Sequence, residues 1–413
     1  MSSVEPRLRP APRARAPFVD RIAFRVLGHE LADLEGGTLQ VRLPDGTERS
    51  FGSGPAVNMH IHDGRLFRRL ATRPKLGLGE SYTAGEWDCD DLVGFFQLLI
   101  LNADAARQRN TFLRRVVEAR PRPNRRNGLL RARRNISYHY DLGNDLFALM
   151  LDETMTYSCA IFDRPEMSLA DAQVAKIDRI CTQLQLGPDD HVLEIGCGWG
   201  GFAIRAAQAT GCRVTGLTIS AQQATLARER IGAAGLSDRI TILEQDYRQH
   251  EGRYSKVASI EMLEAIGDHQ YGTYFATIDR LLEQDGIACI QTILIPDQRW
   301  ERYRKTPDWI EHYIFPGCLI PSLTALTAAA TRSSRLLVHE VHEIGPHYAE
   351  TLRRWHANLR ERQREVRALG YDTTFERTWG FYLAFCEAGF RTLALRDAQL
   401  TLTRSGGWNR GCT

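Results

Sequence analysis

The segment from Val192 to Gly201 constrains the fold of this chain more than any other. It reads Val-Leu-Glu-Ile-Gly-Cys-Gly-Trp-Gly-Gly, a mainly apolar run that ends in a turn rich in glycine, and a helical pattern begins at Phe202. Glycine lets a backbone turn tightly and approach a ligand closely. The N-terminus of the following helix offers free N–H groups. The segment therefore predicts a strand, a turn and a helix that together hold a ligand.

Strand-like and helix-like runs alternate after this turn. Strands are predicted over residues 192–195, 213–219, 240–245, 257–263 and 287–294, with helices over 202–210, 221–234 and 271–282. This alternation is typical of an α/β fold with a doubly wound, mostly parallel sheet. Residues 391–403 alternate apolar and polar side chains, which predicts a closing antiparallel strand or hairpin.

The 413 residues suffice for two or three domains. Residues 1–20 contain several Arg and Pro without an apolar core, and we expect a disordered tail there. Residues 21–115 predict a small N-terminal α+β domain, and residues 116–135 a Pro- and Arg-rich basic linker. Residues 136–413 form the main unit. Its aromatic-rich part, residues 296–380, predicts a helical insertion that covers a ligand pocket.

Basic residues are clustered although the formal net charge is only +3. Residues 114–134 contain nine Arg and one Glu, a local charge of +8, and a second cluster spans residues 353–367. Such clusters suit an anionic surface, either phospholipid or nucleic acid, although a solvated linker has the same composition. Nine Cys without a C-x-x-C motif indicate reduced thiols in the cytosol. The longest apolar run, residues 95–101, is too short to span a membrane.

The ends of the next two strands identify the class of ligand. Dinucleotide enzymes place an acidic residue at the end of the second strand, whereas this chain has Thr218-Ile219-Ser220 there. At the third strand end, Asp246 can accept a hydrogen bond from an adenine amine and Tyr247 can stack on the ring. Upstream, residues 157–160 (Tyr-Ser-Cys-Ala) add small polar groups and a thiol. These features predict methyl transfer from S-adenosylmethionine (SAM).

The chain resembles the cyclopropane-fatty-acyl-phospholipid synthase family of SAM-dependent methyltransferases, which includes the mycolic acid cyclopropane synthases. The matching segments, in order, are residues 137–147, 157–159, 192–201, 216–220 and 313–316, then Tyr348 and Cys386. Residues 78–82 (Leu-Gly-Glu-Ser-Tyr) resemble part of the extra domain of the members that act on bacterial phospholipids. By motif position, the resemblance implies SAM contacts at Tyr157, Ser158, Gly196, Cys197, Gly198, Thr218, Ile219, Gln223, Asp246, Tyr247 and Ile260.

The resemblance also implies the chemistry. An alkene attacks the SAM methyl group and leaves a carbocation, so the site must align the reactants and exclude water. Aromatic faces can stabilise the cation, and Trp309, Tyr313, Phe315 and Tyr348 are candidates unless they serve core packing. In this family a bound bicarbonate is thought to remove the proton that closes the ring. Its implied ligands here are Cys159, Glu264, Tyr348 and the backbone at Ile293. Cys386 matches a family cysteine and is predicted to line the pocket, because the chemistry needs no thiolate.

Two departures from the family pattern bear on the product. Many members have Glu-His and His-Thr-Ile at the fourth and fifth strand ends, whereas this chain has Glu264-Ala265 and Gln291-Thr292-Ile293. Gln291 can donate a hydrogen bond to an anion but cannot titrate near neutral pH. A hydride shift followed by proton loss would give a methylene-branched chain instead of a cyclopropane. A separate reductase would then complete a methyl branch.

The sequence thus predicts a cytoplasmic enzyme, peripheral on the inner membrane face, that methylates the double bond of an unsaturated phospholipid acyl chain and forms a cyclopropane. A methylene-branched product and a small-molecule methyltransferase are the alternatives within the enzyme class, and a non-catalytic lipid-binding protein is another. No nucleic-acid partner and no metal site are predicted. A homodimer and a downstream reductase are further partners that this interpretation allows.

Overall fold

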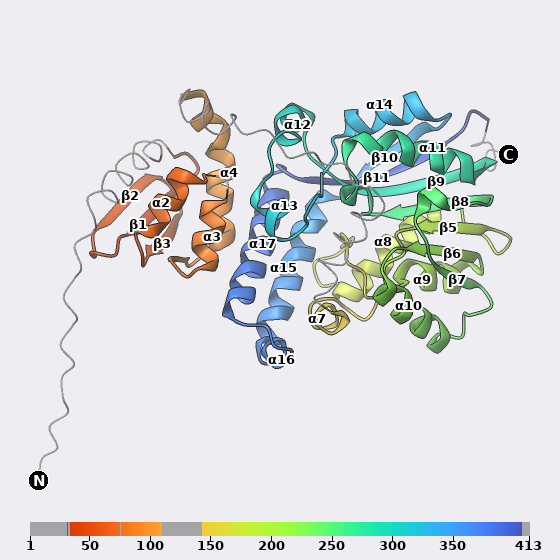
Figure 1. The fold of residues 1–413 in the computed structure, drawn as a ribbon, viewed down its shortest axis with the longest axis horizontal. Coiled ribbons are helices and arrows are strands. Elements are labelled where there is room, and N and C mark those ends of the chain that lie inside the picture. Colours follow the sequence, from red (N-terminus) through yellow and green to blue (C-terminus); the bar gives the residue numbers. More distant parts are fainter. Residues whose placement is uncertain (1–30, 32–33, 75, 110–142, 407–413) are drawn as a thin grey trace, which may run out of the picture. The chain divides into compact units, whose positions relative to one another are not determined.

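The computed structural model describes residue 31 and residues 34–74, 76–109 and 143–406 (Figure 1). The chain divides into two compact units, residues 1–117 and 118–413. The predicted tail (residues 1–20) and the predicted basic linker (residues 116–135) lie outside the described residues.

The N-terminal unit combines a four-stranded sheet of order β2-β1-β3-β4 with helices. A hydrogen bond closes the turn between the first two strands, where the N–H of Gly46, with φ of 84°, donates to the Leu43 carbonyl at 2.9 Å. Trp87 is fully buried, and its indole N–H donates to Ser81 Oγ at 3.0 Å. The elements are β1 (Gly37–Arg42), β2 (Glu48–Ser53), β3 (Ala56–Ile61), α2 (Arg65–Thr72), α3 (Gly77–Thr83), β4 (Trp87–Cys89) and α4 (Leu92–Arg109).

The second unit is organised around a seven-stranded sheet of order β10-β11-β9-β8-β5-β6-β7. Parallel pairing joins β5 (His191–Ile195), β6 (Arg213–Thr218), β7 (Ile240–Glu244), β8 (Tyr254–Ile260) and β9 (Leu282–Leu294). The last strand, β11 (Arg396–Thr403), pairs antiparallel with β9. The doubly wound, mostly parallel α/β fold and the closing antiparallel strand are therefore confirmed.

Helices cover both faces of this sheet (Figure 1). Val192 and Leu193, neighbours in β5, are both fully buried but belong to different hydrophobic clusters, because successive strand residues face opposite sides. One cluster includes residues of α8 (Leu169–Gln183), α9 (Gly201–Thr210) and α10 (Ala221–Ala233). The other includes residues of α11 (Tyr271–Leu281) and α14 (Leu323–Ser333). Burial on both faces is why the central strands β5, β6 and β8 read as apolar runs.

Residues 296–380 are not helical throughout, which corrects the expected helical insertion. Within them, β10 (Leu337–Glu343) pairs antiparallel with β11 at the edge of the sheet, and α14 packs on α11. An edge strand with one partner and exposed side chains carries only a weak apolar signal. The remaining helices include α15 and α17, which pack against each other. They are α7 (Asn144–Met150), α12 (Asp297–Tyr303), α13 (Trp309–Tyr313), α15 (Gly345–Glu361), α16 (Gln363–Ala368) and α17 (Thr373–Arg391).

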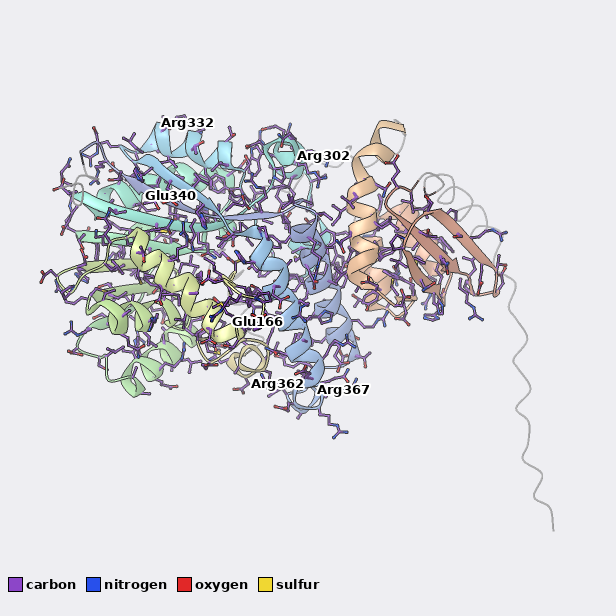
Figure 2. The ribbon with its side chains drawn as sticks, turned by 180° about the vertical axis from the view of Figure 1, so that it is seen from behind. Glu166, Arg302, Arg332, Glu340, Arg362 and Arg367 are labelled. Atoms are coloured by element: carbon purple, nitrogen blue, oxygen red, sulfur yellow. The ribbon has the colours of Figure 1, made fainter. Side chains whose placement is uncertain are left out.

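The second basic cluster, residues 353–367, lies on α15 and α16. Figure 2 shows Arg362 and Arg367 at one end of the second unit, and Arg332 of α14 at the opposite end. Two of the Arg side chains in the cluster pair with Glu350 and one pairs with Glu376. In the part of the chain that the structure describes, no helix is long and apolar enough to cross a membrane.

Candidate active site

The predicted glycine turn after β5 forms, and its backbone is left-handed at three glycines. Gly196, Gly198 and Gly200 have φ values of 85°, 50° and 81°, which side chains with a Cβ rarely adopt. The N–H of Cys197 donates to the Leu217 carbonyl at 2.9 Å and ties the turn to β6. A Cβ placed on Gly198 would have no atom within 4 Å, so this part of the backbone is open to a ligand.

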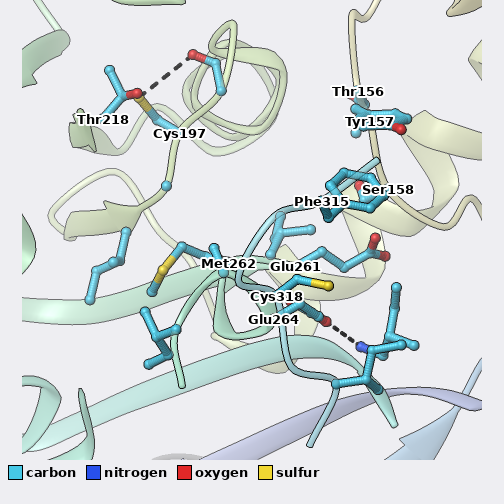
Figure 3. Close-up of a pocket in the computed structure, with 18 of the residues that line it drawn as sticks. Thr156, Tyr157, Ser158, Cys197, Thr218, Glu261, Met262, Glu264, Phe315 and Cys318 are labelled. Atoms are coloured by element: carbon cyan, nitrogen blue, oxygen red, sulfur yellow. Dashed lines mark hydrogen bonds between the residues drawn. The ribbon is translucent and has the colours of Figure 1, made fainter. Parts of the chain in front are cut away.

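A cavity of about 340 Å³ lies beside the turn. Every residue predicted to contact SAM lines it, from Tyr157 through Gly198 to Ile260. Figure 3 shows Cys197 and Thr218 on one side of the cavity and Tyr157 and Ser158 on another. The residues that the sequence predicts to contact SAM therefore surround a single cavity, although up to about a hundred residues separate them along the chain.

Hydrogen bonds hold the polar groups of the cofactor side in place. Thr218 Oγ1 donates to Gln223 Oε1 at 2.9 Å, at the start of α10. The buried carboxylate of Asp246 accepts from the Arg248 guanidinium at 2.8 and 2.6 Å. Arg248 in turn donates to Gln270 at 2.8 Å. Asp246 is thus fixed at the rim of the turn, where the sequence predicts an acceptor for an adenine amine.

Ser158 is held by a lysine that sequence reasoning missed. The buried Lys176 donates from Nζ to Ser158 Oγ at 2.7 Å, and burial lowers the pKa of Lys176. Tyr157 shares a hydrogen bond of 2.9 Å with the hydroxyl of Tyr382. Lys176 lies in a helix with ordinary amphipathic spacing, so its pattern in the sequence does not distinguish it from a surface lysine.

The carboxylate of Glu261 accepts three hydrogen bonds at the far side of the cavity, and nothing in the sequence pattern had marked it as a site residue. Glu261 Oε1 accepts from the backbone N–H of Cys159 and from Gln291 Nε2, both at 2.8 Å. Its Oε2 accepts from the Tyr348 hydroxyl at 2.6 Å. Glu261 follows β8 directly and has φ of 48°, a strained backbone for a residue with a side chain.

Glu264 lies three residues further along and has its own donors. Glu264 Oε1 accepts from the Ile293 N–H and from Thr292 Oγ1, and Figure 3 shows the Glu264 bond beside Glu261. Burial, and then the charge of Glu261, raises the pKa of Glu264 to about 8. Glu264 is therefore largely protonated at neutral pH while Glu261 has three neutral donors around its carboxylate.

Comparison with known proteins assigns this architecture to a family. Residues 128–400 match the sequence profile described as mycolic acid cyclopropane synthetase. The chain belongs to this family. It is therefore a SAM-dependent methyltransferase of the cyclopropane and methylene fatty acid synthase group.

Relatives cover nearly the whole chain. It is 40% identical over 408 residues to the tuberculostearic acid methyltransferase of Mycobacterium tuberculosis, covering 96% of this chain and 93% of that protein. It is 37% identical over 349 residues to the cyclopropane-fatty-acyl-phospholipid synthase of Escherichia coli, covering 84% and 87%. Among solved structures, the mycolic acid cyclopropane synthase CmaA1 complexed with SAH and CTAB has a TM-score of 0.61 and 32% identity, covering 66% of this chain and 98% of that one.

The bicarbonate that the family resemblance implies does not fit the described residues. Two of the implied ligands, Cys159 through its backbone N–H and Tyr348 through its hydroxyl, already donate to Glu261. Gln291, which could also donate to an anion, donates to Glu261 as well. The implied Ile293 N–H donates to the remaining implied ligand, Glu264. A further anion at these donors would lack hydrogen bonds and would lie beside the Glu261 carboxylate in a buried region, where like charges repel strongly.

The two predicted cysteines behave as neutral thiols. Burial raises the pKa of Cys159 and of Cys386 far above the usual range of a thiol. Cys386 lines the cavity, as predicted, whereas Cys159 does not and contributes its backbone N–H. Gln291 also lies outside the cavity lining. Its Oε1 accepts from Gln399 Nε2 at 3.1 Å, which directs the Gln291 amide N–H toward Glu261.

The aromatic candidates divide into two groups. Phe315 and Tyr348 line the cavity, and the Tyr348 ring stacks on Phe390 with centroids 4.4 Å apart. Trp309 and Tyr313 do not line it, and Trp309 packs against Phe381 at 4.5 Å instead. Four more aromatic residues line the cavity, and the sequence did not single them out because their spacing resembles that of core residues. They are Tyr303, Tyr382, Phe385 and Phe390.

Proposed function

We propose that this enzyme transfers the methyl group of SAM to the double bond of an unsaturated phospholipid acyl chain, with closure of a cyclopropane ring. The observation that carries the proposal is a single cavity with two kinds of lining. The glycine turn, Thr218 and Asp246 line it on one side, and apolar and aromatic residues that include Phe315 and Phe385 line it on the other. SAM, when bound, supplies an electrophilic methyl group.

The protein's own residues position the reactants and protect the cation. The open backbone at Gly198 and the fixed carboxylate of Asp246 hold a nucleoside. The rings of Phe315, Tyr348 and Phe390 exclude water and present π-faces to a developing positive charge. Cys386, which stays a neutral thiol because it is buried, is a poor trap for a carbocation.

A methylene-branched product is the second candidate. The relative that matches 96% of this chain is named for tuberculostearic acid. This chain also has Ala265 and Gln291 where many family members have histidine. Both observations favour a different fate for the same cation, in which a hydride shift precedes proton loss.

We further propose that the enzyme is cytoplasmic and reaches its substrate at the inner membrane face. The Escherichia coli relative is named for phospholipid, and the two basic clusters of this chain suit an anionic surface. The N-terminal unit contributes to this docking. A methyltransferase for a small soluble substrate would need neither feature.

Mass spectrometry of fatty acid esters tests the proposal. Purified protein, SAM and vesicles of a monounsaturated phospholipid are incubated, and the esters are separated by gas chromatography. We expect one added CH2 unit. Loss of the double bond identifies a cyclopropane, and retained unsaturation identifies the methylene branch. An unchanged acyl chain would contradict the proposal and favour a small-molecule acceptor.

A further inference from the structure

We propose that the carboxylate of Glu261 is the catalytic base of this enzyme and takes the place of a bound anion. The inference rests on the proposed function and concerns the step after methyl transfer. Its basis is the hydrogen-bonding pattern at the far side of the cavity. There, the groups expected to hold a bicarbonate hold a side chain of the protein instead.

The donors around Glu261 are arranged for an anion. A backbone N–H, an amide N–H and a phenol O–H converge on its two oxygens, at 2.6 to 2.8 Å. All three donors are neutral, and burial together with the charge of Glu261 raises the pKa of Tyr348, which keeps it a phenol. Hydrogen bonds from neutral donors stabilise a carboxylate without cancelling its charge. Such a group can accept a proton.

Glu261 also reaches the substrate space. It lines the cavity together with its donor Tyr348, whereas its other two donor residues, Cys159 and Gln291, do not. The left-handed backbone at Glu261, stabilised by its N–H bond to the Gln291 carbonyl at 2.8 Å, brings the side chain to this position at the end of β8. Strain of this kind persists where the surrounding structure enforces it, which is common at functional sites.

The neighbouring acids are poorer candidates. Glu264 lines the cavity, but its raised pKa of about 8 leaves it mostly protonated at neutral pH. Asp397 is fully buried, does not line the cavity, and burial, followed by the charge of Glu261, raises its pKa well above the usual range. Glu194 lines the cofactor side beside the glycine turn, away from the aromatic residues.

The proposed step balances as follows. Methyl transfer forms a C–C bond, releases the cofactor's thioether and leaves a carbocation on the adjacent carbon. A C–H bond of the added methyl group then breaks, and its electron pair forms the third bond of the ring. After a hydride shift, the same electron pair forms a methylene double bond instead. In both cases the proton goes to an oxygen of Glu261 and reaches solvent after the products leave.

The test compares wild-type enzyme with Glu261→Gln and Glu261→Gly, with Glu340→Gln, an exposed glutamate of β10, as matched control. Turnover on monounsaturated phospholipid is measured with and without removal of dissolved CO2 and bicarbonate. SAM binding is measured by calorimetry.

We expect wild-type turnover to be independent of bicarbonate. Both Glu261 variants should bind SAM normally and lose about 10²-fold or more in kcat, the usual contribution of a general base. Added bicarbonate or formate should restore turnover to Glu261→Gly, which has room for the anion and tolerates positive φ.

Two results would overturn the inference in an active wild-type enzyme. One is a kcat for Glu261→Gln within about threefold of wild type, because removal of a general base causes a much larger loss. The other is a fall in wild-type turnover when bicarbonate is removed, a measurement that needs no variant. A wild-type enzyme that leaves the acyl chain unchanged would instead overturn the proposed function, and the inference with it.

Discussion

At the scale of residues, buried ionisable groups define the chemistry of this site. Glu264 and Asp397 have raised pKa values and Lys176 a lowered one, in each case chiefly because burial disfavours the charged form. Glu261 lies among them with three donors of its own. The arrangement places one carboxylate with three hydrogen-bond donors beside neighbours that burial drives toward neutrality.

The raised pKa of Glu264 predicts a pH-dependent stability. Its folded pKa of about 8 exceeds the ordinary value of 4.5, so the folded state retains a proton that the unfolded state loses. The stabilisation from this proton is complete below about pH 4.5 and is lost as pH rises through 8. Glu264→Gln removes this loss, so the Tm of the variant relative to wild type should rise between pH 6 and pH 9, by about 2–4 °C per kcal/mol.

Thermal unfolding at a series of pH values measures this difference, with Glu340→Gln as the exposed control. Asp397 and Lys176 are present in both proteins, and the replacement also removes the charge by which Glu264 helps to raise the pKa of Asp397. A Tm difference between Glu264→Gln and wild type that stays constant from pH 6 to pH 9 would show that Glu264 has an ordinary pKa.

Some site residues could be predicted from the sequence and others could not, for a physical reason. The glycine turn, Thr218 and Asp246 follow strand ends of a parallel sheet, and such ends meet at one edge, so their proximity was predictable. Glu261 escaped because its role depends on a left-handed backbone and on donors from three distant segments. In the sequence, this residue is only a glutamate that follows an apolar strand. Neither its backbone angle nor the meeting of those segments can be predicted from that pattern.

At the scale of elements, close packing between β6 and the glycine turn shapes the cofactor side. Gly216 lies in the middle of β6. A Cβ at Gly216 would lie 2.9 Å from Cys197 Cβ and 2.7 Å from Ile242 Cδ1. The missing side chain therefore lets the turn pack directly on the strand, which positions Cys197 and Gly198 at the cavity.

Gly216→Ala should accordingly weaken both the fold and SAM binding. The added methyl group must displace the turn or Ile242, at a cost of about 1–3 kcal/mol for an overpacked core. The matched control is Gly232→Ala in α10, where a Cβ would have no atom within 4 Å, and we expect a gain of about 0.5–1 kcal/mol there. Thermal unfolding and calorimetric titration with SAM measure both effects. Wild-type SAM affinity in Gly216→Ala would refute this account of the turn.

The elements themselves were predictable where periodicity was strong. All five parallel strands form, and β5, β6, β8 and the second half of β9 are buried on both faces and read as apolar runs, whereas the edge strand β7 alternates between buried and exposed side chains. Residues 296–380 were predicted to be a helical insertion, and the strand β10 within them was missed. The position of β10 at the sheet edge depends on its pairing with β11, about sixty residues later in the sequence. A pairing between distant segments has no local signal in one sequence.

At the scale of the whole molecule, the proposed function makes charge distribution important for access to the substrate. The acyl chain of a phospholipid is reached at a lipid surface, and each basic side chain near an anionic surface contributes about 1 kcal/mol of binding, which salt screens. The chain has two basic clusters, residues 114–134 with a net charge of +8 and residues 353–367. Part of the second cluster is neutralised by Glu350 and Glu376. The first cluster should therefore dominate docking.

Replacement of Arg125, Arg126, Arg133 and Arg134 by Gln should then lower binding to anionic vesicles by about 10²-fold or more at low salt. The comparison variant Arg360→Gln/Arg364→Gln removes two exposed charges from the second cluster and should have a smaller effect. The control variant Arg302→Gln/Arg332→Gln removes two charges from α12 and α14. Vesicle co-sedimentation over a range of salt concentrations measures all three.

The three variants distinguish docking by a particular cluster from a general effect of net charge. If net charge alone matters, the two double variants should weaken binding equally, because each removes two positive charges. If the first cluster contacts the membrane, its variant should lose more affinity and more of the salt dependence per charge removed than either double variant. Unchanged vesicle affinity in the variant with four replacements would exclude residues 114–134 from docking, while turnover on phospholipid dispersed in detergent should remain near that of wild type.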